Sequence, residues 1–117
     1  DVILVRRIIK LPKSIYDIAD AAAKRMEALS KAKQMGTALI IYASDYDDNL
    51  PTDRNLKGLI DPYIQNSDMV DGFNYTFKGG PLKDVKSPAE TELGYVDGPG
   101  GRAVVYVDGH AKWVPNK

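Results

Sequence analysis

The chain has 117 residues, of which 44% are hydrophobic and 27% charged, as is ordinary for one small globular domain. Sixteen Lys and Arg residues balance sixteen Asp and Glu residues, so the net charge gives no support for a nucleic-acid partner. The absence of cysteine excludes disulfides, thiol nucleophiles and cysteine-ligated zinc sites.

Residues 1–13 form a separate basic and apolar segment, in which Arg6, Arg7, Lys10 and Lys13 are interleaved with aliphatic side chains. The pattern fits a short helix or a strand equally well. We favour an amphipathic element docked on its own domain over contact with a membrane surface. The apolar run from Val2 to Val5 is too short to span a bilayer, and a start at Asp1 leaves a missing upstream segment open.

One long helix is predicted over residues 14–48, because apolar residues recur there every three or four positions. About 34 helical residues span roughly 50 Å, whereas a compact domain of this size is only about 35 Å across. The N-terminal part should therefore project and need a partner. The predicted assembly interface consists of Ile15, Ile18, Ala22, Met26 and Leu29. Gly36 leaves a second arrangement open, in which two helices meet there.

A second, shorter helix is predicted over residues 53–64, with Asp53 as its N-cap and Leu56, Leu59 and Ile60 as its apolar residues. Pro62 disturbs this pattern, so the end of the helix is uncertain. Residues 65–72 are expected to form a loop.

The remainder predicts a β-meander over residues 73–114, with strands at 73–77, 92–96, 102–107 and 110–114. Gly98–Gly101 and Asp108–Gly109 supply the turn residues between the last three strands. The expected fold is α+β. A long N-terminal helix packs through residues 39–46 on a three- to four-stranded antiparallel sheet, all within one domain at 14–117.

Three stretches carry a resemblance to a known family: residues 32–51 at the helix end, residues 87–91, and residues 101–114 with their Asp108-Gly109-His110 turn. Together they resemble bacterial prepilin-like proteins, namely type II secretion pseudopilins and the related pilin-like proteins of planctomycetes and verrucomicrobia. Residues 1–13 depart from that family, whose helix begins with an apolar stretch of about twenty residues.

The resemblance implies a pilin-like fold and a structural role in a type II secretion or type IV pilus-like apparatus of the bacterial envelope, periplasmic or extracellular. The implied partners are further copies of the chain and other subunits of the apparatus. Membrane anchoring would come only through a missing upstream segment. The alternative is a soluble extracytoplasmic binding module with the same fold.

No catalytic site is expected, because a histidine-based site needs a poised partner and the chain has no cysteine and no histidine besides His110. Asp45, Asp47 and Asn49 fit the start of an EF-hand loop, but Leu50 and Leu56 replace its required Gly and Glu. The resemblance implies calcium in a C-terminal loop, for which Asp97 and Asp108 are the candidate ligands. Ordinary turn chemistry is the favoured interpretation of both, and no other cofactor is expected.

Overall fold

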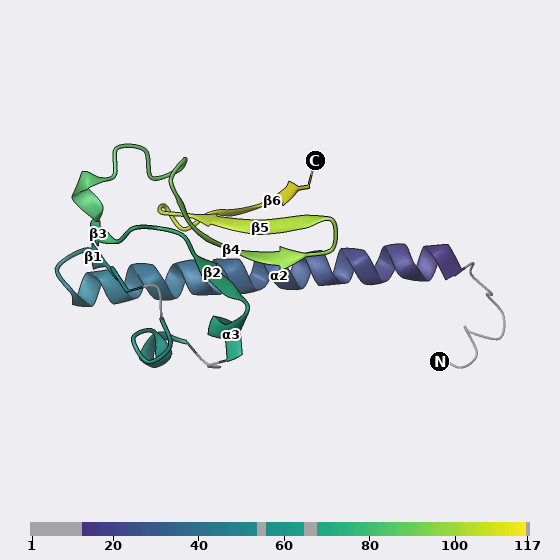
Figure 1. Ribbon diagram of the computed structural model, residues 1–117, viewed down its shortest axis with the longest axis horizontal. Coiled ribbons are helices and arrows are strands. Elements are labelled where there is room, and N and C mark those ends of the chain that lie inside the picture. Colours follow the sequence, from purple (N-terminus) through teal and green to yellow (C-terminus); the bar gives the residue numbers. More distant parts are fainter. Residues whose placement is uncertain (1–12, 54–55, 65–67, 117) are drawn as a thin grey trace.

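The computed structural model describes residues 13–53, 56–64 and 68–116. It has the predicted α+β class, with helix α2 (Lys13–Asp45) lying along a small antiparallel sheet (Figure 1). The prediction for residues 1–13 falls outside the described residues, except that Lys13 begins the helix.

Helix α2 is a single helix of 33 residues that passes through Gly36, so the alternative of two helices is wrong. It ends at Asp45, three residues before the predicted boundary. Asp47 and Asp48 adopt left-handed backbone conformations with φ of 56° and 61°, which a right-handed helix cannot continue. The Asn49 side chain donates to the carbonyl of Tyr46 at 2.9 Å and closes this turn.

The predicted helix at 53–64 is wrong over the part of it that the structure describes. Residues 57–59 form a turn, and only a single 3-10 turn, η1 (Asp61–Tyr63), follows. Gly58 has φ of +93°, which leaves the helical region, and Pro62 has no backbone N–H to donate. The expected loop at 65–72 instead contains one helical turn, α3 (Asp68–Asp71).

The main sheet confirms the predicted meander. Its strands are β2 (Phe73–Tyr75), β4 (Glu92–Gly98), β5 (Gly101–Tyr106) and β6 (Ala111–Pro115). They pair antiparallel in the order β2-β4-β5-β6. Gly98 pairs with Gly101, so the β4–β5 connection is a two-residue turn. Strand β2 is shorter than predicted and ends at Tyr75.

A second ladder, which was not predicted, joins β1 (Asn49–Leu50) to β3 (Gly80–Pro81). Beside it, the backbone N–H of Leu82 donates to the carbonyl of Asp48 at 2.8 Å. The buried hydroxyl of Tyr75 donates to the carbonyl of Pro51 at 2.7 Å. These contacts bind the chain after α2 to the segment after β2. A 3-10 turn, η2 (Leu82–Asp84), follows β3.

The core lies between α2 and the inner face of the main sheet. Helix residues Ala28, Ala32, Met35 and Leu39 are buried in it, so helix coverage begins well before the predicted stretch at 39–46. Tyr46, at the other end of that predicted stretch, is exposed. Trp113 of β6 packs against the core, as expected of a residue that fixes the last strand to the helix.

Candidate functional site

The N-terminal part of α2 projects from the globular body (Figure 1). We define residues 15–27 as the stem, because Ala28 is the first fully buried residue among the described side chains. The whole helix spans about 50 Å at ~1.5 Å per residue. The seven residues of β4, the longest described strand, span only about 23 Å. The sheet is therefore too short to cover the whole stem, although at the junction with the body Arg25 lies over the Trp113 ring of β6.

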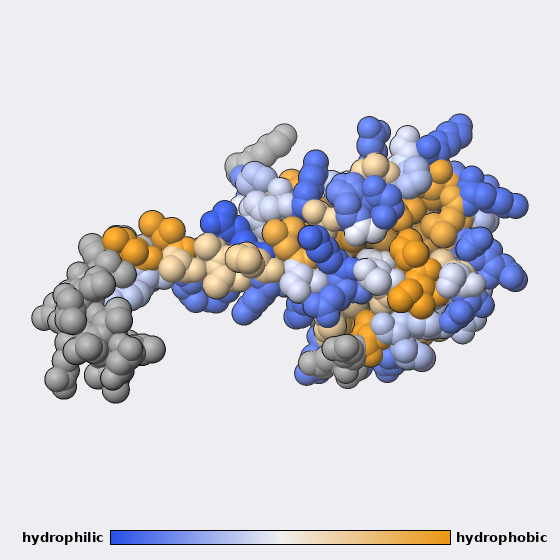
Figure 2. Space-filling model, turned by 180° about the vertical axis from the view of Figure 1, so that it is seen from behind, coloured by the Kyte–Doolittle hydropathy of each residue, from blue (hydrophilic) through white to orange (hydrophobic). Residues whose placement is uncertain are grey.

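The predicted assembly residues lie along the stem and at its junction with the body. The side chains of Ile15, Ile18 and Met26 are 43%, 65% and 71% exposed. Ala22 and Leu29 are half-buried, and Leu29 packs against the core. Figure 2 shows apolar residues following one another along the projecting stem, with polar residues beside them.

The apolar face of the stem is centred on a different side of α2 from the face that packs on the sheet, and the two overlap at one edge, because Ile18 lies at the same helical angle as Gly36, which faces Val105. At about 100° per residue, the apolar stem residues centre roughly 110° around the helix from the line of Ala28, Ala32 and Leu39. Continued towards the N-terminus, that line passes through Ala21 and Asp17. The sequence prediction followed a single apolar stripe from Ile15 to Ala43. The structure leaves its N-terminal part exposed and buries Ala32, Gly36 and Ala43 in its C-terminal part.

Charged residues of the stem are gathered on the side opposite its apolar face. Four of its five charged residues, Asp17, Asp20, Lys24 and Glu27, lie within about 80° of one another by the same helical geometry. Asp20 and Lys24 form an exposed ion pair at 3.1 Å. With Arg25 included, the stem has two cations and three anions, so it is not basic.

Small residues widen the uncharged face. Ala19, Ala22 and Ala23 border the larger side chains of Ile15, Ile18 and Met26. Alanine allows the backbone of a neighbouring helix to approach closely, and the larger side chains supply apolar area. The sequence prediction included Ala22 in this face but not Ala19 or Ala23. The separation of charged from uncharged residues by helical angle could have shown them, because it is already present in the sequence.

Asp97 and Asp108, the candidate calcium ligands, are not brought together. Asp97 of β4 lies opposite Arg102 in the strand register, near the start of β5, whereas Asp108 follows the end of that strand. The six residues of β5 span about 20 Å, so one ion cannot contact both carboxylates. Among the described residues, no three His, Asp or Glu side chains gather in a group that could hold a metal ion.

The Asp108-Gly109-His110 turn is organised by the Asp108 carboxylate. It accepts the backbone N–H of His110 at 3.1 Å and also contacts Nδ1 of the same histidine. These hydrogen bonds lower the pKa of Asp108 below its usual value. The imidazole of His110 stacks on the Tyr106 ring, with centroids 4.5 Å apart. The contacts of this histidine are therefore local to its own turn.

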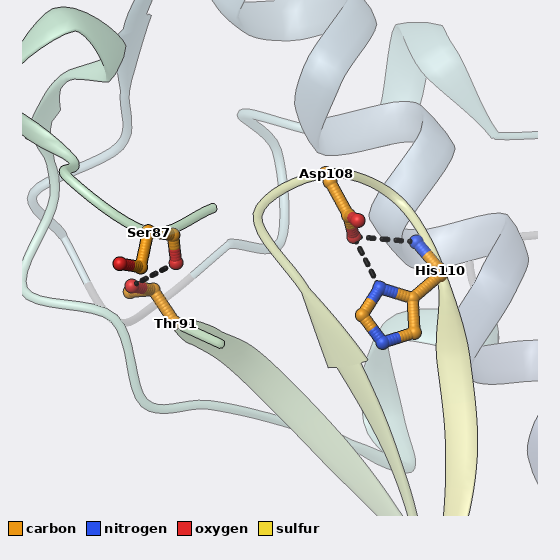
Figure 3. Close-up of polar contacts among 4 residues, drawn as sticks. All are labelled: Ser87, Thr91, Asp108 and His110. Atoms are coloured by element: carbon orange, nitrogen blue, oxygen red, sulfur yellow. Dashed lines mark hydrogen bonds and ion pairs between the residues drawn. The ribbon is translucent and has the colours of Figure 1, made fainter. Parts of the chain in front are cut away.

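Two of the stretches that carry the family resemblance are neighbours in space. The N–H groups of Val107 and Asp108 donate to the carbonyls of Thr91 and Pro88, at 2.9 and 3.3 Å. Figure 3 shows both stretches: the Thr91 hydroxyl donates to the carbonyl of Ser87, and Asp108 faces His110. The hydrogen bonds from Val107 and Asp108 therefore fix the position of the turn relative to residues 87–91.

Two further findings bear on the site. Within residues 13–53, 56–64 and 68–116, no helix combines the length and the apolar character needed to cross a membrane. No protein-family model, curated protein or solved structure matches this chain.

Proposed function

We propose that the chain is a structural subunit, similar to pseudopilins, of a type II secretion or type IV pilus-like apparatus in the bacterial envelope. It assembles with copies of itself and with other subunits through the stem. The observation that carries the proposal is the unbroken helix α2, whose stem exposes Ile15 and Ile18 in its projecting part and Met26 at its junction with the body.

The charge distribution favours a helical protein partner over a lipid surface. Helices that lie on anionic membranes have polar faces rich in Lys and Arg, whereas this stem has more anions than cations. An uncharged face bordered by alanines suits close packing against another helix. Burial of that face contributes about 25 cal/mol per Å² of apolar surface.

The size of the stem predicts assemblies larger than a dimer. A stable interface of standard size uses about 20–30 residues from each partner. Residues 15–27 number only thirteen, so one stem-to-stem contact is weak. We therefore expect association to depend on concentration and to gain stability from several neighbours.

Sedimentation velocity over a range of protein concentrations tests the proposal. The wild-type chain should associate, and the double variant Ile18→Glu, Met26→Glu should remain monomeric. Lys24→Glu is the matched control, because it also makes the charge more negative by two but lies on the charged side of the stem, opposite the apolar face, where its side chain is 60% exposed. Circular dichroism should show an intact fold in every variant.

Two results would contradict the proposal: a wild-type chain that stays monomeric at all concentrations, or a double variant that associates like the wild type. A monomer that also released or absorbed stoichiometric heat on calcium addition would favour the binding module instead.

A further inference from the structure

We propose that Met26 is an oxidation site through which peroxides weaken the assembly of the stem; this inference rests on the proposed function. The Met26 side chain is 71% exposed, the largest value among the exposed large hydrophobic residues that the structure describes. The other two methionines differ sharply from it. Met35 is fully buried in the core, and Met69 is half-buried and packs against the core.

Oxidation would change the chemistry of this position on the stem. The thioether sulfur of Met26 attacks a hydroperoxide, the O–O bond breaks, and one oxygen is transferred to sulfur. The sulfur loses two electrons, and the hydroperoxide is reduced to an alcohol, or hydrogen peroxide to water. The product is methionine sulfoxide. The oxidation therefore converts a flexible apolar side chain into a polar one.

The position of Met26 makes that change matter for assembly. It lies one helical turn from Ala22 on one side and from Leu29 on the other, at the end of the apolar face nearest the body. A neighbouring stem packed on this face would bury the sulfoxide oxygen, which is a hydrogen-bond acceptor, among aliphatic groups without a donor. Burial of such an unpaired polar group is unfavourable. Association should therefore become at least tenfold weaker.

The test treats the full chain with dilute hydrogen peroxide and follows two readouts. Peptide mass mapping should show one added oxygen at Met26 before any at Met35. Sedimentation should show association weakened at least tenfold, and methionine sulfoxide reductase should restore it. Met26→Leu keeps an apolar side chain without sulfur, so its association should be unaffected by peroxide. Met26→Gln, a polar variant of similar length, should associate as weakly as the oxidised chain.

Each contrary result has a distinct meaning. Oxidation at Met26 without weaker association would overturn the inference, and so would equal weakening of the Met26→Leu variant by peroxide. Oxidation of Met35 as fast as Met26 would also overturn it. A wild-type chain that never self-associates would overturn the proposed function, and this inference with it, even where mass mapping shows selective oxidation at Met26.

Discussion

Gly36 of α2 lies directly on Val105 of β5, where the helix crosses the main sheet. A Cβ atom at Gly36 would lie 2.5 Å from Cγ2 of Val105, and Val105 is 0% exposed. Glycine inside a helix costs about 1 kcal/mol relative to alanine. The close approach of helix and sheet explains why a glycine occupies this position.

Gly36→Ala should lower the free energy of unfolding by about 1–3 kcal/mol, because overpacking against a buried valine outweighs the better helix propensity of alanine. Urea unfolding measures the change. Val105→Ala makes room for the added methyl group, so the double variant should be more stable than the sum of the two single effects. A more stable Gly36→Ala protein would show that the sheet moves to accommodate the methyl group.

The Asp108 turn should contribute stability that acid removes. Its folded pKa is lowered by the backbone and side-chain hydrogen bonds from His110. A carboxyl group with a lowered folded pKa stabilises the fold above its unfolded value, near 3.8, and that contribution is lost as pH falls through the folded pKa. Asp108→Ala should therefore lower Tm at pH 6 and have a smaller effect at pH 2.

Thermal unfolding of wild type and Asp108→Ala between pH 7 and pH 2 measures this difference. Asp108→Asn separates the two contributions, because an amide oxygen still accepts the N–H of His110 but carries no charge. A difference in Tm between wild type and Asp108→Ala that stays constant over this range would contradict the prediction.

The Tyr75 hydroxyl should contribute more to the free energy of unfolding than the Tyr63 hydroxyl. Tyr75 donates to the Pro51 carbonyl in a buried setting, and burial raises the pKa of Tyr75. Tyr63 donates at the surface to the Asp45 carboxylate, and that hydrogen bond raises the pKa of Tyr63 to about 12. Tyr75→Phe should lower the free energy of unfolding by about 1–2 kcal/mol, because it removes the donor to a carbonyl at a buried site. Tyr63→Phe should have a much smaller effect.

Urea unfolding at neutral pH compares the two phenylalanine variants. Because the pKa of Tyr75 is higher in the folded state than the unfolded value of 10.0, its contribution to stability is complete below pH 10 and is lost as the pH rises beyond that value. Wild type should therefore lose stability above pH 10 more steeply than Tyr75→Phe. If Tyr75→Phe and Tyr63→Phe lowered the free energy of unfolding equally at neutral pH, the difference in burial between the two hydroxyls would not affect stability, and the prediction would be wrong.

Local signals predicted most of the fold. Periodic apolar residues predicted α2, and the turn residues around Gly98–Gly101 and Asp108–Gly109 predicted the order of the last strands. The helix at 53–64 failed because the left-handed backbone at Gly58 outweighs the apolar spacing around it. The β1–β3 ladder could not be predicted, because two strands of two residues each leave no alternating pattern.

The candidate site was predictable only in part. The exposure of Ile15, Ile18 and Met26 followed from the length of the helix alone. The orientation of their face relative to the sheet required knowing that Ala28, Ala32 and Leu39 form the packed line. The separation of Asp97 from Asp108 was implicit in the meander, since turns at the two ends of one strand lie a strand length apart.

The rotation between the apolar face of the stem and the packed line of α2 has a consequence for engineering. Ile15, Ile18 and Met26 are exposed in the monomer, so a designer can alter the proposed recognition between subunits there with little effect on the stability of the fold. New interaction specificities could be installed at positions 15, 18 and 26 without any compensating change in the interior.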